Sequence, residues 1–558
     1  MKTRSQALEL ASLAEFDLVV VGGGIVGAGI AQDAASRGMS VLLIEKHDFA
    51  SGTSSKTTKL IHGGLRYLEQ LQLKLTKELC HERSVLEQLA PHMVRDFSFV
   101  LPITRQKRFF GYKAQLALTL YDMLSFPATK NSAHQRIGQK EVLESAPALS
   151  ASVVIGGLRF HDCITDDSRL VLEVLKSAIS EGANVVNYLE VVGFQVENNR
   201  VTAVQCHDRY AGTELTIGCK SCVNATGVWS DQLLQKIDTS WQPRLSPAKG
   251  IHITVPPSAF ETNTALFLPT QDNRYAFVVP WQRSIMIGTT DTLYKGDINK
   301  PLPNQDEIDY LLHVVNQYTG KNQLNRSDIT AAWAGLRPLV GPGGGQAAGS
   351  TSKMSREHMI VEGPAGVITL VGGKLTNYRI MAGQVIEKVL EKFPQPTAAL
   401  RQSKTRRLML GGWSDRNDFL TTTADIAAKA RRVSIEPATV DHLIASYGKD
   451  AQLIVDIVEN KPSLNQRICP DFPNILAEVP FCVLNEMAVS LEDLLFRRMR
   501  LAALHQSQCL EAAPKVAQLM QGLLSWDDAR TALELAALEK SLNEHISSFS
   551  AVPSLTGG

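Results

Sequence analysis

A glycine-rich turn that follows the first buried strand limits the possible folds of this chain more than any other part of its sequence. The short, β-branched run Phe16–Val21 has the composition of a strand buried on both faces of a parallel sheet. Gly22, Gly24 and Gly27 follow it in the spacing Gly-x-Gly-x-x-Gly and open a segment of small residues that predicts a helix packed closely on a sheet. A second buried strand is predicted at 39–45, which completes a βαβ unit. The chain is therefore expected to be an α/β protein.

The same turn has the chemistry of a dinucleotide-binding site. Glycine permits the tight turn and lets backbone amides approach a pyrophosphate, while the start of the helix supplies a partial positive charge. Glu45, at the end of the second strand, is placed to accept hydrogen bonds from a ribose. The spacing leaves NAD and FAD open, and the alternative is a glycine-rich turn that binds no ligand.

Length and charge exclude several classes of protein. The chain has 558 residues, more than a single hydrophobic core organises, so roughly two to four packed units are expected. Its 57 basic and 56 acidic side chains nearly cancel, so the molecule has no overall positive field with which to hold nucleic acid. The eight cysteines are scattered, and their one close pair, Cys219 and Cys222, is expected to fill the core. No metal site is predicted.

No segment has the pattern of a secretory signal or of a membrane-spanning helix. Residues 1–15 include charged side chains and lack an uninterrupted apolar core. No apolar run approaches the roughly 20 residues that cross a bilayer. The chain is therefore expected in the cytoplasm, and any membrane contact is expected at the bilayer surface.

The dinucleotide-binding domain is expected to be assembled from three separate stretches of the chain. A helix predicted from Ser168 to Gly182 and strands around an Asn198–Asn199 turn lead to Asn224–Gly227, which returns the chain to the nucleotide fold. Strand-like runs further on predict a mixed or antiparallel sheet, and the last part of the chain has helical periodicity. The predicted division is 16–95, 156–245 and 346–395 for the dinucleotide-binding domain, 96–155 and 246–345 for a substrate-binding cap, and 400–545 for a C-terminal helical domain.

Five further segments carry a resemblance to a known family. They are Thr53–Leu68, Lys249–His252, Ile287–Asp291, Ala334–Leu339 and Gly372–Arg379. Together they resemble the flavin-dependent glycerol-3-phosphate dehydrogenases, over nearly the whole chain. The resemblance implies a glutathione-reductase-like, FAD-binding Rossmann domain with a mixed or antiparallel substrate cap and a C-terminal helical domain. Because the segment at 224–227 also resembles a strand end of FAD enzymes, FAD is preferred to NAD.

The resemblance implies which residues bind FAD. Two adjacent glycines at 372 and 373 are expected near the isoalloxazine ring, which can lie against backbone where side chains are absent. The full expected set is Gly22, Gly24, Gly27, Glu45, Thr53, Ser54, His62, Gly63, Gly64, Ala225, Thr226, Gly227, Gly372, Gly373, Lys374, Leu375 and Thr376.

The implied substrate, sn-glycerol 3-phosphate, carries a phosphate that is close to a dianion. A pocket for it should gather guanidinium and ammonium groups, whose burial the ligand then compensates. The resemblance assigns Arg66, Arg337 and Lys374 to this role, with Tyr67 and Thr376 as neutral hydrogen-bonding neighbours. The alternatives are structural: a surface ion pair for Arg66, support of the next turn for Arg337, and a helix cap for Lys374.

Oxidation of the secondary alcohol requires a base that removes the hydroxyl proton while hydride leaves the carbon. His252 is the expected base, and Arg337 is expected to be the second catalytic residue. His252 ends a Lys-Gly-Ile-His segment that resembles the family's lysine-glycine-serine-histidine signature, from which Ile251 departs. His62 is the rival and is expected beside the flavin. A buried structural histidine is the alternative for His252.

The resemblance leaves the electron acceptor open between a membrane quinone, ubiquinone or menaquinone, and oxygen, which would yield peroxide. Quinone is the first expectation. The segment 105–124 joins basic and aromatic residues to an apolar stretch, which is typical of a helix that lies on a membrane surface, here the inner face of the cell membrane. An ordinary packed cap helix is the alternative. A non-catalytic dinucleotide-binding regulatory protein is a further alternative for the whole chain, and a homodimer stays open.

Overall fold

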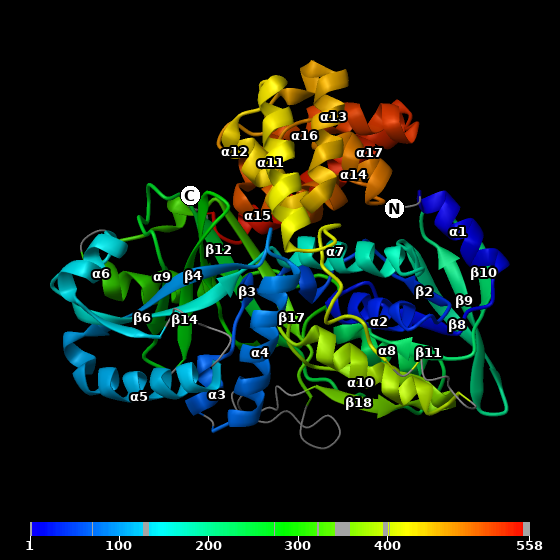
Figure 1. The fold of residues 1–558 in the computed structure, drawn as a ribbon, viewed down its shortest axis with the longest axis horizontal. Coiled ribbons are helices and arrows are strands. Elements are labelled where there is room, and N and C mark those ends of the chain that lie inside the picture. Colours follow the sequence, from blue (N-terminus) through cyan, green and yellow to red (C-terminus); the bar gives the residue numbers. More distant parts are fainter. Residues whose placement is uncertain are drawn as a thin grey trace, which may run out of the picture.

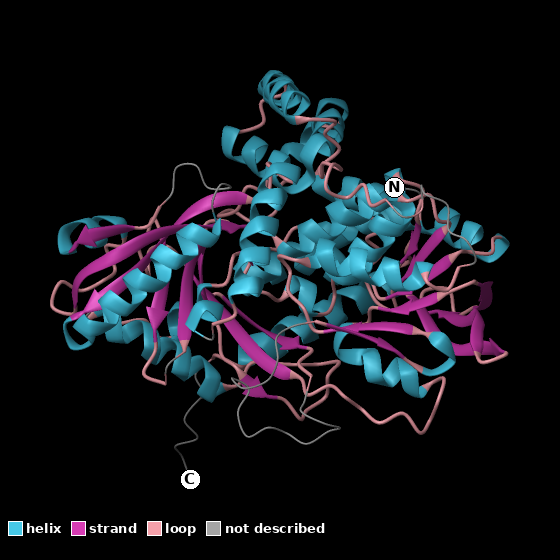
Figure 2. Cartoon of the chain, turned by 60° about the horizontal axis from the view of Figure 1, so that its bottom comes forward, coloured by secondary structure: helices cyan, strands magenta, loops and turns pink. Residues whose placement is uncertain are grey.

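The computed structural model describes residues 3–69, 71–125, 133–272, 274–320, 323–340, 358–393, 400 and 402–550, without the side chains of Arg66, Glu69 and Arg108. Two sheets lie side by side, and a helical domain built from the last part of the chain stands over the junction between them (Figure 1). Figure 2 shows the strands gathered in two groups with helices around and above them.

The first sheet is the predicted Rossmann sheet. Its strand order is β18-β19-β11-β1-β2-β7, and every neighbouring pair is parallel except β18 with β19. Helix α2 packs against both α7 and α10 in this domain. A small antiparallel sheet, β8 to β10, extends from it. The bounds are β1 Leu18–Val21, α2 Ile25–Ser36, β2 Val41–Ile44, α7 Asp167–Ser180, β7 Asn184–Val186, β8 Leu189–Glu197, β9 Arg200–Asp208, β10 Glu214–Gly218, β11 Cys222–Asn224, α8 Ser230–Gln235, β18 Met359–Glu362, β19 Ile368–Val371 and α10 Tyr378–Leu390.

The second sheet is mostly antiparallel, as the sequence predicts for the cap. Its order is β16-β12-β15-β14-β13-β4-β6-β3, with β17 on β12 and β5 on β6, and only β13 with β4 is parallel among the described pairs. The strands are β3 Leu60–Ile61, β4 Arg95–Thr104, β5 Gln135–Gly138, β6 Val154–Ile164, β12 Ala248–Val255, β13 Ala265–Pro269, β14 Tyr275–Trp281, β15 Ser284–Gly288, β16 Thr292–Leu293 and β17 Ala331–Arg337. The helices beside it are α3 Leu65–Glu69, α4 Leu73–Leu89, α5 Arg108–Ser125, α6 Gln139–Ser145 and α9 Gln305–Thr319.

The C-terminal domain has its own apolar core. Its elements are α11 Arg416–Arg432, α12 Pro437–Tyr447, α13 Ala451–Asn460, α14 Glu478–Asn485, the π-helix η9 Asp493–Arg498, α15 Leu501–Leu504, α16 Gln506–Leu524 and α17 Asp528–Ser547. It contacts the Rossmann domain through α7 and the cap through β17. The fold class expected from the sequence is confirmed.

Some local expectations change. Helix α7 is capped by Asp166, whose carboxylate accepts from the amides of Ser168 and Arg169, so the helix begins before the predicted Ser168. An additional helix, α1 Arg4–Leu13, precedes the first strand. None of the described helices has the length and apolarity that crossing a membrane requires. All eight cysteines are buried and free, in agreement with a packing role for Cys219 and Cys222.

Candidate active site

Two cavities adjoin at the ends of the Rossmann strands. The first is a groove lined by the turn after β1, the loop after β2, the turn after β11 and the turn after β19. Parallel strands bring all four connections to one edge of the sheet, which is where ligands bind in folds of this type. Of the residues predicted to bind the cofactor, those that line this groove are Gly22, Gly24, Glu45, Thr53, Ser54, Ala225, Thr226, Gly227, Gly372, Gly373, Lys374 and Leu375.

The groove has the shape that a dinucleotide needs. Gly22 has φ +114°, and a Cβ on it would lie 2.6 Å from the carbonyl oxygen of Ala225. Gly27 does not line the groove; a Cβ there would come within 1.8 Å of the Gly22 carbonyl oxygen, so this glycine lets α2 approach the turn. Gly372 and Gly373 have φ +79° and +90°, a conformation that favours glycine, and these two positions place no side chain in the groove. The residues present therefore fit a dinucleotide.

Glu45 closes the groove at the end of β2. One carboxylate oxygen accepts from the amide of Gly23 at 2.7 Å and the other from the amide of His47 at 2.9 Å. Burial raises the pKa of Glu45, and these two amides oppose the rise. The acid is thus held in one orientation at the position where the motif predicts a ribose contact.

The second cavity has a volume of about 290 Å³ and meets the first at Thr53, Thr57, Pro338 and residues 372–375. It brings together most of the predicted substrate and flavin residues: His62, Gly64, Tyr67, Arg337, Lys374 and Thr376. Gly63 lies behind the wall, and the side chain of Arg66 lies outside the described part of the structure. The opposite wall is aromatic and consists of Phe99, Phe160, Phe267, Tyr275 and Phe277.

The lining of the cavity carries three cationic side chains, Arg274, Arg337 and Lys374, and two carboxylates, Asp162 and Asp291. Nη1 of Arg337 lies 3.1 Å from Oδ1 of Asp291, and Nη2 donates to Oγ1 of Thr289 at 3.1 Å. The ammonium of Lys374 lies 4.7 Å from the centre of the Tyr67 ring. Arg274, which precedes β14, is a further cation on the wall; the sequence reasoning missed it because no motif surrounds it. An anionic group of a ligand would be stabilised here.

The two candidate histidines occupy different places. His252, on β12, is 2% exposed and does not line the cavity. Its Nε2 lies 3.0 Å from Oγ1 of Thr58, which does line the cavity, and its ring stacks on Trp333 at 5.3 Å. Burial, with the charges of Lys59 and Arg337, holds the pKa of His252 well below its usual value. The predicted base therefore stands behind Thr58.

His62 lies in the cavity wall itself. Its amide donates to Oγ1 of Thr376 at 3.2 Å, and burial lowers the pKa of its ring. A lowered pKa keeps this imidazole neutral near pH 7, which is the form that accepts a proton. The cavity that contains Arg337 and Lys374 thus has His62, not His252, as its lining imidazole.

A buried cluster that the sequence reasoning missed supports the backbone next to His62. The amide of Gly63 donates to the hydroxyl of Tyr121 at 2.8 Å and lies 3.3 Å from Oδ1 of Asp162. Tyr121 donates to the same Asp162 oxygen at 2.7 Å, and Arg83 donates to it at 2.6 Å. These residues come from β6, α4 and α5, so only the folded chain brings them together.

Comparisons with known proteins agree with this geometry. The family described as "FAD dependent oxidoreductase" matches residues 17–379, and the "C-terminal domain of alpha-glycerophosphate oxidase" matches residues 403–531. Glycerol-3-phosphate dehydrogenase 2 of Mycobacterium tuberculosis is 36% identical over 94% of this chain and 87% of its own length. The aerobic glycerol-3-phosphate dehydrogenase of Staphylococcus saprophyticus is 33% identical over 95% of this chain and 94% of its own. The structure of glycerol-3-phosphate dehydrogenase from Bacillus halodurans, complexed with FAD, superposes with a TM-score of 0.80 at 29% identity and covers 99% of both chains.

Proposed function

Because the chain belongs to the family of FAD-dependent glycerol-3-phosphate dehydrogenases and oxidases, we propose that it oxidises sn-glycerol 3-phosphate to dihydroxyacetone phosphate and delivers the electrons to a membrane quinone. The cofactor is FAD. One observation carries the proposal: the cavity that contains Arg337, Lys374 and His62 meets the FAD groove at Gly372 and Gly373. Cations, a neutral imidazole and the cofactor groove thereby share one small space.

The cations bind and orient the substrate. Arg337 and Lys374, with Arg66 as a further expected ligand, attract the phosphate, and the hydroxyl of Thr376 lines the same space. Asp291 and Thr289 hold the Arg337 guanidinium, which keeps this group in place before substrate enters. The aromatic wall excludes water from the carbon end of the substrate. Bound FAD supplies the chemistry of hydride acceptance.

His62 takes the hydroxyl proton on a ring nitrogen. Among the charges around it, Asp162 raises its pKa and Lys374 and Arg83 lower it. Phosphate bound to Lys374 would offset part of that lowering and make the imidazole a stronger base when substrate is present. His252 has an indirect role, since its contact with Thr58 fixes a hydroxyl in the cavity wall.

The reductive half-reaction tests this function. Purified protein with bound flavin should lose its oxidised-flavin absorption when sn-glycerol 3-phosphate is added without oxygen. The enantiomer, sn-glycerol 1-phosphate, is the control and should bleach the flavin far more slowly. A flavin that stays oxidised with the sn-3 isomer would contradict the proposal and favour a non-catalytic dinucleotide-binding protein.

The proposals of a quinone acceptor and of membrane docking rest on helix α5. Phe109, Tyr112, Leu116 and Met123 are 84%, 62%, 73% and 70% exposed, and the helical period gathers them on one face. Lys113 lies beside them and is exposed, so apolar and cationic groups occur together, as on helices that lie in a membrane surface. We propose that this face docks on the inner leaflet from the cytoplasm. Reoxidation of the reduced protein by a ubiquinone or menaquinone analogue, compared with oxygen and peroxide formation, decides between dehydrogenase and oxidase.

A further inference from the structure

The C-terminal domain contains a short irregular segment between α14 and α15. Residues Asp493–Arg498 form a π-helix, and Arg500 has the left-handed φ of +66°. π-turns are rare and are often found at functional sites, and a non-glycine residue with positive φ persists only where its surroundings hold it. The segment contains three arginines, Arg497, Arg498 and Arg500, and all three side chains are buried.

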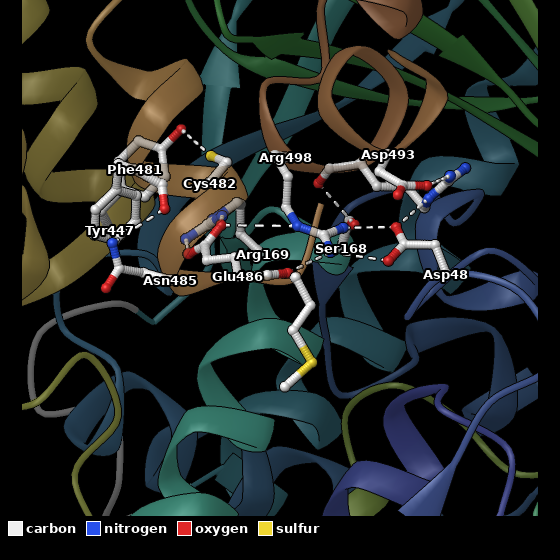
Figure 3. A network of polar contacts seen from close by, with 12 residues as sticks. Asp48, Ser168, Arg169, Tyr447, Phe481, Cys482, Asn485, Glu486, Asp493 and Arg498 are labelled. Carbon is white, nitrogen blue, oxygen red and sulfur yellow. Dashed lines mark hydrogen bonds and ion pairs between the residues drawn. The ribbon is translucent and has the colours of Figure 1, made fainter. Parts of the chain in front are cut away.

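Two of these arginines, Arg497 and Arg498, bind one carboxylate of the Rossmann domain, that of Asp48. Arg498 donates from Nη1 and Nη2 to the two oxygens of Asp48, at 2.6 and 2.8 Å, and Nε of Arg497 lies 2.5 Å from Oδ2 of Asp48. Figure 3 shows Arg498 between Asp48 and Glu486. Neighbouring side chains of a regular α-helix diverge, so two consecutive arginines cannot readily reach one acid. The wider π-turn brings both to Asp48.

The third arginine, Arg500, binds the same loop, which follows β2, at a position farther along the chain. Nη2 of Arg500 donates to the carbonyl oxygen of Ser55 at 2.8 Å and to Oδ1 of Asp167 at 3.0 Å. The buried ammonium of Lys59 donates to the same Ser55 oxygen at 2.9 Å. The loop is thereby held at Asp48 and at Ser55, by residues about 450 positions away in the sequence.

Between these two anchors lies a wall of the FAD groove. Residues 51–54 line the groove, and Glu45, three positions before Asp48, closes it. The hydroxyl of Ser54 accepts from the amide of Ile25 at 3.0 Å, which ties this wall to the start of α2. A displacement of either anchor would move the groups that face the cofactor.

We propose that Arg497, Arg498 and Arg500 are positioning residues for FAD, so that the C-terminal domain forms part of the cofactor site. Docking of this domain and binding of FAD are then linked. FAD stabilises the docked domain, and the docked domain raises the affinity for FAD by the same factor.

The network offers a matched control. Arg169 is as buried as Arg498 and also joins the two domains, through Glu486 at 2.7 and 2.8 Å. The side-chain hydrogen bonds described for Arg169 go to Ser446, Glu173 and Glu486, outside the loop that lines the FAD groove, whereas Arg498 donates to Asp48 of that loop. Arg498→Met and Arg169→Met each remove one buried guanidinium and leave an acid less compensated, so both should lower thermal stability. Only the first should alter the FAD site.

The experiment measures FAD affinity without substrate. Each variant is stripped of flavin and titrated with FAD while the quenching of flavin fluorescence is recorded, and the thermal midpoint is measured with and without FAD. Arg498→Met should bind FAD at least about tenfold more weakly than Arg169→Met, a difference of about 1.4 kcal/mol. The thermal shift that FAD produces should shrink in the same variant. Equal affinities in the two variants would overturn the proposal.

A milder pair keeps the test decisive if Arg498→Met does not fold. Asp48→Asn preserves size and hydrogen-bond acceptance at the anchor but removes its charge, and Arg500→Lys retains a cation without the fork. Both should weaken FAD binding relative to Arg169→Lys. FAD affinities that equal that of Arg169→Lys would refute the positioning role, whatever the variants do to turnover of glycerol 3-phosphate.

Discussion

Two histidines are candidates for the proton of the substrate hydroxyl, and their positions predict different effects of substitution. His62 lines the cavity, so His62→Asn should lower kcat by about a hundredfold or more, the usual contribution of a general base, with a smaller change in KM. His252→Asn should have a smaller effect, because His252 reaches the cavity only through Thr58. Steady-state kinetics from pH 5.5 to 9 would measure both, and a larger loss of kcat in the His252 variant would restore that residue as the base.

Arg337 and Lys374, the two described cations assigned to the substrate, predict how its phosphate is recognised. Arg337→Lys retains the charge but loses the planar fork, so the KM for sn-glycerol 3-phosphate should rise about ten- to hundredfold, as expected for one or two charge-assisted hydrogen bonds. Unphosphorylated glycerol serves as the control substrate, and the rate of any oxidation of it should change little. An unchanged KM for the phosphate ester would mean that Arg337 is occupied wholly by its contacts with Asp291 and Thr289.

The sequence predicted residues that stand in motifs better than residues that meet only in the fold. Tyr67, Arg337, Lys374 and Thr376 were expected together, and they do line one cavity. His252 was identified by its motif, but a motif does not reveal whether a strand residue faces a cavity or the layer behind it. The residue that covers it, Thr58, lies 194 positions away in the sequence. Tyr121 and Asp162 carry no motif, and their link to Gly63 depends on three elements distant in sequence.

At the scale of elements, α5 joins the molecular surface to the active site. Its exposed face carries Phe109 and Leu116, while Tyr121 on its buried side bonds to Asp162 and to the amide next to His62. Tyr121→Phe removes a donor from Asp162, so the acid's charge acts more strongly on His62 and should raise the pKa of that ring. The acid limb of kcat/KM should therefore move to higher pH. A profile that superposes on the wild type would show that Tyr121 only packs.

The exposed face of α5 predicts membrane binding. Phe109→Ser with Leu116→Ser removes two large apolar side chains that would enter the bilayer, each worth about 1.5–3 kcal/mol when fully buried. The partition coefficient for anionic vesicles, measured by sedimentation, should then fall at least about a hundredfold. Leu533→Ser is the matched control, because this leucine is 67% exposed on α17 of the C-terminal domain. Vesicle binding that survives the double change would contradict docking through the exposed face of α5.

The ends of helices and strands could be predicted where turn-forming or capping residues lie within a few positions of them. The Asn198–Asn199 turn between β8 and β9 was predicted, and both residues have the positive φ that such a turn requires. The start of α7 was misassigned because both Asp166 and Ser168 are good capping residues, and only the folded backbone selects the aspartate. The π-turn at 493–498 was not predicted, because the contacts of its arginines with Asp48 form only when the two domains meet in the folded chain.

At the scale of the whole molecule, the domain junction contains buried groups that make stability depend on pH. His92 precedes β4, is 4% exposed, and accepts from Nε1 of Trp413 at 3.3 Å, next to the start of the C-terminal domain. Its other ring nitrogen is buried, with no partner among the described residues. Burial lowers the pKa of His92 to about 3, and burial likewise lowers the pKa of His545 to about 4.

The sign of the resulting pH dependence follows from which state binds the proton. Between pH 6.5 and 4 the unfolded chain protonates these histidines and the folded chain does not, so the folded state loses stability as pH falls. From pH 7.5 to 5 the loss from His92 alone is about 2 kcal/mol. Thermal midpoints at pH 7.5, 6 and 5 should therefore fall steeply for the wild type and less steeply for His92→Gln, whose amide oxygen can still accept from Trp413. Parallel curves for the two proteins would mean that His92 takes up its proton over the same pH range in the folded and unfolded states, and so does not contribute to the pH dependence of stability.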